Sequence, residues 1–175
     1  MISKTKKYLL LILLSAAITR IIAANLASVS SDEMVYSILP WNFISAHRLG
    51  TLIQSPLYFY LADAGYKLFG EVSALSGRLP SILFGSLSIL VIFLLSKEIF
   101  KNDKAALLSS SLAAFSGYTL FNNYEYDMAA FFFSLVSIFF LIKAFDGRYN
   151  YLYLSAVFFG ISILIGLILL KTPFF

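Results

Sequence analysis

The sequence predicts an all-α protein: a polytopic transmembrane helical bundle of about five spans, with an interfacial helix in a long first external loop. Of its 175 residues, 60% are hydrophobic and only 13% are charged, whereas soluble domains average about 45–50% and about 25%. Apolar runs of roughly the 20 residues needed to cross a bilayer recur along the chain. This pattern excludes a soluble globular domain and predicts a single membrane domain over residues 1–175.

The residue types that bind metals or form disulfides are scarce. Cysteine is absent and His47 is the single histidine, which excludes a disulfide framework and a multi-histidine or thiolate metal site within this chain. The sequence therefore predicts no cofactor, and it leaves open whether a metal ion assists. The net charge of +4 arises mainly from lysines in short loops between apolar runs, a pattern typical of membrane topology and not of nucleic-acid binding.

The first span is predicted at about residues 8–28, behind a basic N-terminus. Such a start is also typical of a signal peptide, but residues 22–28 lack a clean Ala-x-Ala cleavage site, which favours a retained span. Arg20 lies in the outer part of this span. A membrane arginine either extends to the lipid headgroups or belongs to a site, and its nearness to the surface favours the first interpretation.

Residues 29–77 form a predicted external loop that contains a helix of its own. Ser55-Pro56 is a helix-start signature and Phe69-Gly70 is a stop. At 14 residues, about 21 Å, this helix is too short to span comfortably. Asp63 and Lys67 lie on one face in the favourable order for an ion pair, and we expect the helix to lie on the outer membrane interface.

Four further spans are predicted at about residues 79–95, 105–121, 128–145 and 151–170. The span at 105–121 is rich in small residues, which let helix backbones approach closely, so we expect it near the centre of the bundle.

The distribution of basic residues predicts a cytoplasmic N-terminus, because lysine and arginine are enriched in cytoplasmic loops. With that orientation, eight basic residues lie inside and four outside. The inner ones are Lys4, Lys6, Lys7, Lys97, Lys101, Lys104, Lys143 and Arg148, and the outer ones are Arg48, Lys67, Arg78 and Lys171.

Two acidic clusters are then predicted to face the same outer side. Asp32-Glu33 follows the first span, and Glu125-Tyr126-Asp127 precedes the fourth. Adjacent carboxylates on a helix point about 100° apart and can serve different roles, one of them as a general base. The alternative is that these acids simply begin helices, where negative charge is favoured regardless of function.

Two outer basic residues complete the set of candidates. Arg78 opens the second span and Lys171 closes the fifth. Without further context, Arg78 is equally well explained as a contact with headgroup phosphates, and a plain interfacial anchor is the favoured interpretation of Lys171.

The landmarks occur in a specific order along nearly the whole chain, namely Ser31–Tyr36 (SDEMVY), Ser55–Leu61 (SPLYFYL), Leu68–Gly70, Arg78–Gly85 (RLPSILFG), Tyr124–Asp127 (YEYD) and Lys171–Pro173. This order resembles the N-terminal part of the GT-C glycosyltransferases. These polytopic enzymes include the protein O-mannosyltransferases, the aminoarabinose transferases and related lipid-A glycosyltransferases.

The resemblance implies a sugar transferase that uses a polyprenyl-phosphate-linked sugar as donor and acts on an acceptor at the outer face. It implies that Asp32 is the general base and that Glu33 and Asp127 share the catalytic site. The basic positions matched by Arg78 and Lys171 would meet the lipid phosphate, and Glu125 would contribute to substrate binding.

The sequence also departs from that family. Many members have His or Lys just before the proline matched by Pro56, where this chain has Gln54-Ser55. Members also have more spans, so we expect the N-terminal portion of a larger enzyme, or a chain that acts with a completing polypeptide.

Two other functions stay open on the residues alone. A non-catalytic membrane assembly subunit would show the same spans. A transporter fragment is less favoured, because it predicts charges near the membrane midplane, and the charges within spans, Arg20 and Lys143, lie near span ends.

The predicted topology can be tested by single-cysteine labelling, for which the cysteine-free chain is well suited. Cysteines at Lys101 and Asn150 should be protected from an impermeant thiol reagent in intact cells, and one at Glu71 should be labelled. The reverse pattern would overturn the orientation.

Overall fold

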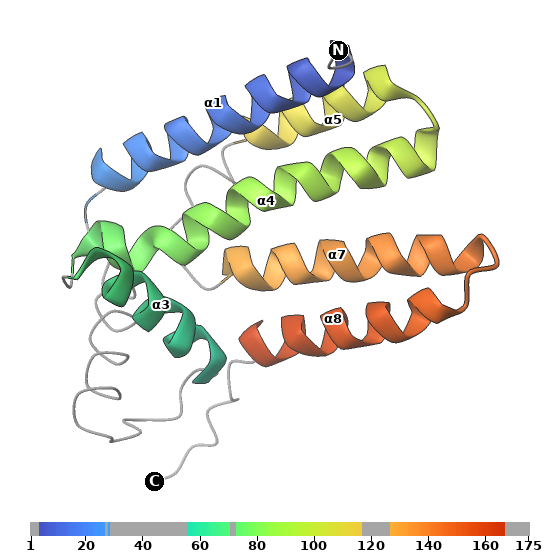
Figure 1. Ribbon diagram of the computed structural model, residues 1–175. Coiled ribbons are helices and arrows are strands. Elements are labelled where there is room, and N and C mark those ends of the chain that lie inside the picture. The colour runs from blue at the N-terminus through green and yellow to red at the C-terminus, as the bar shows by residue number, and fades with distance from the viewer. Residues whose placement is uncertain (1–3, 27, 29–55, 71–72, 117–126, 167–175) are drawn as a thin grey trace, which may run out of the picture.

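The computed structural model describes residues 4–26, 28, 56–70, 73–116 and 127–166. This described part contains six helices and no strand (Figure 1). The helices are α1 (Lys4–Leu26), α3 (Pro56–Phe69), α4 (Ala74–Phe100), α5 (Asp103–Ala114), α7 (Asp127–Phe145) and α8 (Asn150–Gly166).

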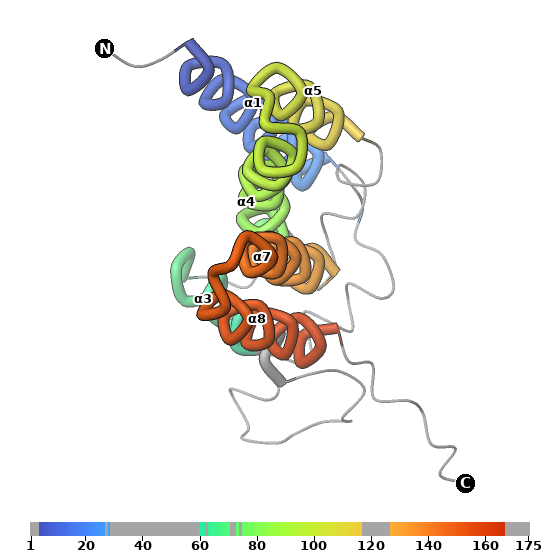
Figure 2. Tube along the Cα trace, turned by 90° about the vertical axis from the view of Figure 1, so that its right-hand side faces the viewer, coloured from blue at the N-terminus to red at the C-terminus, as the bar shows by residue number. Residues whose placement is uncertain are grey.

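Five of these helices run alongside one another, and they alternate in direction along the chain (Figure 1). Seen along their axes, they form a row in which α1 and α5 lie together, followed by α4, α7 and α8 (Figure 2). One end of the row holds the N-terminus and the turns α4–α5 and α7–α8, and we call it the N-terminal end. The other, the α3 end, holds the end of α1, the beginnings of α4 and α7, and the obliquely placed α3.

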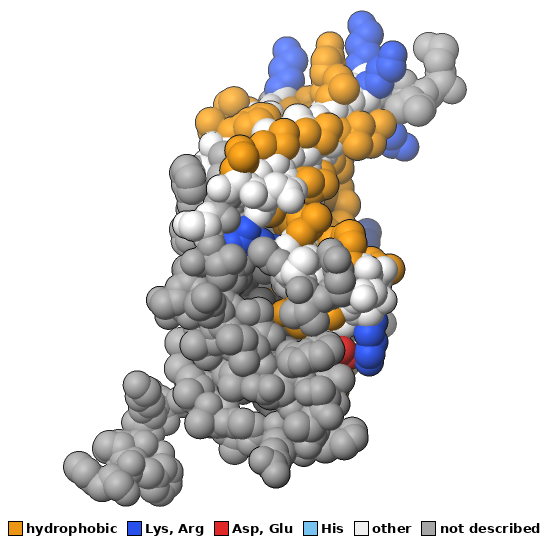
Figure 3. Space-filling model, turned by 90° about the vertical axis from the view of Figure 1, so that its left-hand side faces the viewer, with side chains coloured by type: hydrophobic (Ala, Val, Ile, Leu, Met, Phe, Trp, Pro, Cys, Tyr) orange, Lys and Arg blue, Asp and Glu red, His pale blue; other side chains and the backbone are white. Residues whose placement is uncertain are grey.

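Three helices are long and apolar enough to cross a membrane: Lys4–Leu26, Leu75–Phe100 and Asp127–Phe145. The described part of α8 is equally apolar but shorter. Large hydrophobic side chains are exposed along these helices, and they cover much of the described surface visible in Figure 3. These features confirm the predicted all-helical membrane bundle, since such a surface suits lipid and not water.

The second predicted span is longer at both ends than the sequence indicated. It was expected at 79–95, with the external loop reaching residue 77, but α4 runs from Ala74 to Phe100. Its start is set by a capping box, in which the Ser73 side chain accepts from Ser76 N at 3.3 Å and Ser73 N donates to Ser76 Oγ at 2.8 Å. These bonds satisfy backbone donors that a helix start otherwise leaves unpaired.

The third predicted span was expected over 105–121; its residues up to Ala114 lie in α5, and residues 117–121 lie outside the described residues. α5 ends at Ala114, where the N–H of Phe115 still donates to the Ser111 carbonyl at 3.3 Å. Ser116 and Gly117 come next in the sequence, and both residue types favour a helix less than alanine does. The 12 residues of α5 span about 18 Å, less than the hydrocarbon thickness of about 30 Å.

The central helix is α4, and the expectation that the small-residue span occupies the centre was wrong. In the most apolar 18-residue stretch of α4, 56% of the residues are buried, whereas in that of α1 only 17% are. The helix α4 also contacts α1, α3, α5 and α7. The helix α5 lies at one edge, against α4 and α1. Its small residues Ala106, Ser110 and Ala114 form a buried stripe, so they do permit close approach, but at the edge of the row.

Paired serines join α7 to α8. Ser137 and Ser155 each donate their hydroxyl to the other's carbonyl at 2.9 Å, and Ser162 Oγ donates to the Ala130 carbonyl at 2.8 Å. In membrane proteins such interhelical bonds stabilise by about 0.6 kcal/mol each on average. Their reciprocal pattern fixes how α7 and α8 are aligned along their length.

The helix α3 has the bounds that the sequence predicted, Pro56–Phe69, and its Asp63–Lys67 ion pair forms at 2.7 Å. It ends at Gly70, which has φ +70° and donates to the Tyr66 carbonyl at 2.9 Å, a common way for glycine to terminate a helix.

The contact of α3 with α4 depends on glycine. A Cβ added at Gly65 would overlap the Ser76 carbonyl oxygen. Pro80 lies four residues after Ser76 inside α4 and cannot donate the usual helical bond to that carbonyl, because proline has no N–H. The two helices therefore meet backbone to backbone.

Gly65→Ala should force α3 away from α4 and destabilise the protein by about 1–3 kcal/mol, the usual effect of overpacking. Gly160→Ala is the matched control, because a Cβ at Gly160 meets nothing within 4 Å and alanine favours a helix interior by about 0.5–1 kcal/mol. Thermal unfolding in detergent compares the two. Equal melting temperatures for both variants would contradict the backbone contact.

Candidate functional site

Two of the six predicted site residues, Arg78 and Asp127, lie in the described part of the chain. Arg78 is the fifth residue of α4 and Asp127 is the first of α7. Both helices begin at the α3 end (Figure 1), so the structure brings these two residues to the same end of the bundle. The other four candidates, Asp32, Glu33, Glu125 and Lys171, lie outside the described residues.

Arg78 connects the beginning of α4 to the end of α1. Its side chain is 1% exposed. Nη1 donates to the carbonyl of Ala24, and Nη2 donates to that of Ser28 at 3.3 Å. The last carbonyls of a helix have no intrahelical partners, so a guanidinium, with its planar fork of donors, is well suited to bind them. Arg78 is therefore a buried helix-end ligand, and the interpretation as a surface contact with headgroups does not describe it.

Arg20 is a second buried arginine, which the sequence did not identify as a site residue. The favoured expectation was that it extends to the membrane surface, but its side chain is 0% exposed. Nη1 donates to the carbonyl of Ala16 at 3.1 Å. Within the described part of the chain, Nε and Nη2 have no hydrogen-bond partner. A charged group without partners in a membrane span is costly, and such residues are commonly functional.

Both guanidiniums lie against one stripe of α1. Its buried residues are Ala16, Arg20 and Ala24, spaced by four, and Ala16 packs against Ile89 of α4 and Ala114 of α5. The carbonyls of Ala16 and Ala24 are about 12 Å apart along the helix axis. The seam between α1 and its neighbours thus holds two buried guanidiniums in succession.

The signal that could have identified Arg20 is the spacing itself. Small residues four positions before and after an arginine form a narrow stripe on a helix. Another helix can approach such a stripe closely, and this encloses the arginine instead of leaving it in lipid.

Asp127 begins α7 and is half-buried. A carboxylate in the first turn of a helix interacts favourably with the positive end of the helix dipole. This position agrees with both interpretations of the acidic cluster, a helix start and a site acid. Among the described residues, no group of three His, Cys, Asp or Glu side chains is arranged to hold a metal ion.

The fold defines a helical integral membrane protein. Its buried arginine Arg78 lies at the α3 end, where α7 begins with the acidic residue Asp127. Residues 53–168, about two thirds of the chain, match the family described as dolichyl-phosphate-mannose-protein mannosyltransferase. The chain belongs to this family of membrane glycosyltransferases, which confirms the resemblance to the GT-C enzymes. No curated protein and no solved structure matches the chain.

Arg78→Met should destabilise the protein by about 2–3 kcal/mol, because hydrogen bonds to charged groups are worth about 1.5–3 kcal/mol and the carbonyls of Ala24 and Ser28 would lose theirs. Arg148→Met, at an exposed position before α8, removes the same charge and should change stability little. Unfolding in detergent, followed by circular dichroism, measures both. A wild-type transition for Arg78→Met would show that the bonds to α1 contribute nothing.

Proposed function

We propose that this protein takes part in transfer of a sugar from a polyprenyl-phosphate-linked donor to an acceptor hydroxyl at the outer membrane face. The observation that carries the proposal is the position of Arg78. It is buried at the α3 end, against the end of α1, and Asp32 and Glu33 follow the last residue of α1 by six and seven positions in the sequence. Membership of the mannosyltransferase family supports the reaction class.

In the proposed reaction the Asp32 carboxylate accepts the proton of the acceptor hydroxyl. The hydroxyl oxygen forms a bond to the anomeric carbon of the sugar, and the bond from that carbon to the phosphate oxygen breaks. The electron pair leaves with the polyprenyl phosphate, so the configuration at the anomeric carbon inverts. A base within hydrogen-bond reach typically accelerates such a step by about 10²–10⁴-fold.

The remaining predicted residues take supporting roles in this proposal. Arg78 and Lys171 offset the negative charge of the leaving phosphate, and cations placed where charge develops are among the largest contributions to catalysis. Glu33 and Asp127 orient the acceptor and the sugar, and Glu125 binds substrate.

The electrostatics of the α1 seam favour an anionic donor. Arg20 and Arg78 lie buried along one stripe of α1, and in a medium of low dielectric their positive potential is weakly screened. A lipid phosphate arriving at the α3 end would be attracted by both charges. At the α3 end, the acceptor hydroxyl would approach from water, while the polyprenyl chain of the donor would stay in the lipid.

The proposal includes a cytoplasmic N-terminus, which places the α3 end on the outer side. It also includes a completing polypeptide or a longer chain, because the GT-C enzymes that the sequence resembles have more spans.

Asp32→Asn keeps the shape of the side chain and removes the base. Membranes containing the full protein should then transfer radiolabelled sugar from a polyprenyl-phosphate donor about 10²–10⁴-fold more slowly. Asp146→Asn is the matched control, since Asp146 is exposed in the turn before α8 at the N-terminal end.

Transfer at the normal rate by Asp32→Asn would refute the base assignment and leave Asp32 as a residue that begins a helix. A matching loss in Asp146→Asn would indicate a general effect of charge and would refute it equally.

A further inference from the structure

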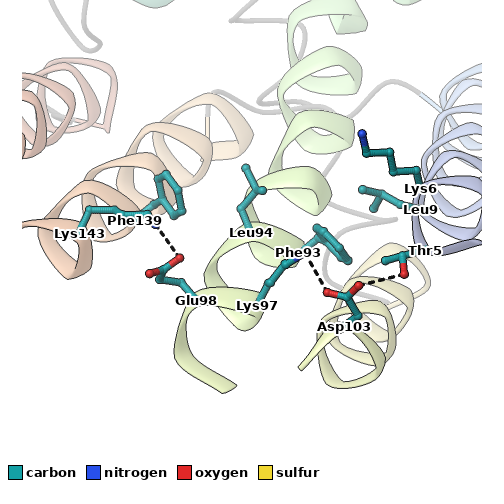
Figure 4. Close-up of a pocket in the computed structure, with 10 residues that line it drawn as sticks. All are labelled: Thr5, Lys6, Leu9, Phe93, Leu94, Lys97, Glu98, Asp103, Phe139 and Lys143. Atoms are coloured by element: carbon teal, nitrogen blue, oxygen red, sulfur yellow. Dashed lines mark hydrogen bonds and ion pairs between the residues drawn. The ribbon is translucent and has the colours of Figure 1, made fainter. Parts of the chain in front are cut away.

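The N-terminal end of the bundle contains a pocket that the proposed reaction does not use. It has a volume of about 440 Å³ and is formed where α1, α4, α5 and α7 meet. Figure 4 shows the lining residues of α4 in the middle, those of α7 on one side and those of α1 and α5 on the other. The pocket lies at the opposite end from Arg78 and Asp127, so it is independent of the site above.

The pocket combines an apolar wall with a charged rim. Leu9, Phe93, Leu94 and Phe139 supply the wall, and Leu94 is 37% exposed. Figure 4 shows Leu94 between two ion-paired groups, one on each side. Such a lining matches the glycerol region of a phospholipid: the apolar wall suits the beginnings of the acyl chains, and the charged groups suit the headgroup.

Both carboxylates of the rim are already bound by cations. Asp103 accepts from Lys97 at 2.9 Å and from Thr5 at 2.9 Å. The hydrogen bonds from Lys97 and then from Thr5 lower the pKa of Asp103 below its ordinary value, so it remains ionised at neutral pH. This acid is therefore engaged in holding α1, α4 and α5 together.

The second carboxylate is shared in the same way. Glu98 accepts from Lys143 at 2.7 Å and from Lys101 at 2.7 Å. Lys143 also lies over the ring of Phe139, 5.7 Å from its centroid. With Lys6 on the rim, four lysines accompany two carboxylates. An ammonium has three donors, so Lys97 and Lys143 can each bind a further acceptor beside their carboxylate.

We propose that this pocket binds the headgroup phosphate of an anionic phospholipid from the membrane leaflet at the N-terminal end. The excess of lysine favours a net negative headgroup, because each basic residue near an anionic membrane surface contributes about 1 kcal/mol of attraction. The apolar wall favours a lipid over a free phosphate ion, and the volume lies in the range of small-ligand sites. The lipid would bridge α7 to α1 and α5 across the surface of α4, against which all three helices pack.

Native mass spectrometry of the full protein in neutral detergent tests this proposal. Phosphatidylglycerol should bind at least tenfold more tightly than phosphatidylcholine with the same acyl chains. Inorganic phosphate at the same concentration should not displace it. Equal binding of the two lipids would overturn the preference for an anion, and displacement by inorganic phosphate would identify a site for the free ion.

Two variants and one control locate the binding. Lys6→Gln removes an exposed rim charge and should weaken phosphatidylglycerol binding about tenfold, the usual scale for one charge-assisted hydrogen bond. Lys7→Gln makes the same change one residue away, outside the pocket lining, and should bind like the wild type. Leu94→Trp fills the pocket and should also weaken binding. If Lys6→Gln binds as tightly as Lys7→Gln, the lipid is not in this pocket, whatever the behaviour of Leu94→Trp.

Discussion

The end of α1 imposes the constraint on which the rest of the bundle depends. The last carbonyls of a helix lack intrahelical partners, and lipid offers no water to replace them. Arg78 binds one of these carbonyls, that of Ala24, and also the carbonyl of Ser28, two residues beyond the end of α1. It thus fixes the end of α1 against the fifth residue of α4. Because α4 also contacts α3, α5 and α7, the positions of these helices are set relative to that joint, and α8 follows through its serine pairs with α7.

Much of the fold could be predicted because apolar length and helix-end residues are local properties. The bounds of α3 follow from Ser55-Pro56 and Gly70, and the start of α7 agrees with the prediction to within one residue. The errors in the predicted helix bounds arose where a weaker local signal sets the helix end. The cap at Ser73 lacks the usual Glu or Gln at its third position and uses Ser76 instead, and α5 ends early without a proline.

The candidate site was less predictable than the fold, because burial depends on which helices approach. The sequence places Arg20 and Arg78 near the outer ends of spans, where exposure to headgroups and burial in a seam look alike. The structure separates these alternatives: Arg20 lies on the buried stripe of α1, between Ala16 and Ala24, and its side chain is buried. Arg78 is enclosed by the end of α1. No local pattern indicates which carbonyls the Arg78 guanidinium will bind, because they lie 50 residues or more away in the chain.

Because α3 contacts α4 through its backbone at Gly65, the orientation of α3 depends little on the side chains that it exposes. Two helices that meet through side chains change their angle when those side chains change, whereas the closest approach here is between the backbone at Gly65 and the carbonyl of Ser76. Apart from the buried Tyr66 and from Leu61, which packs against Ala129 and Ile165, the side chains of α3 can therefore vary while the helix keeps its slant across the bundle. If α3 faces an acceptor, a family of such proteins could alter what it recognises by substitution along one helix, without rebuilding the membrane-embedded frame beneath it.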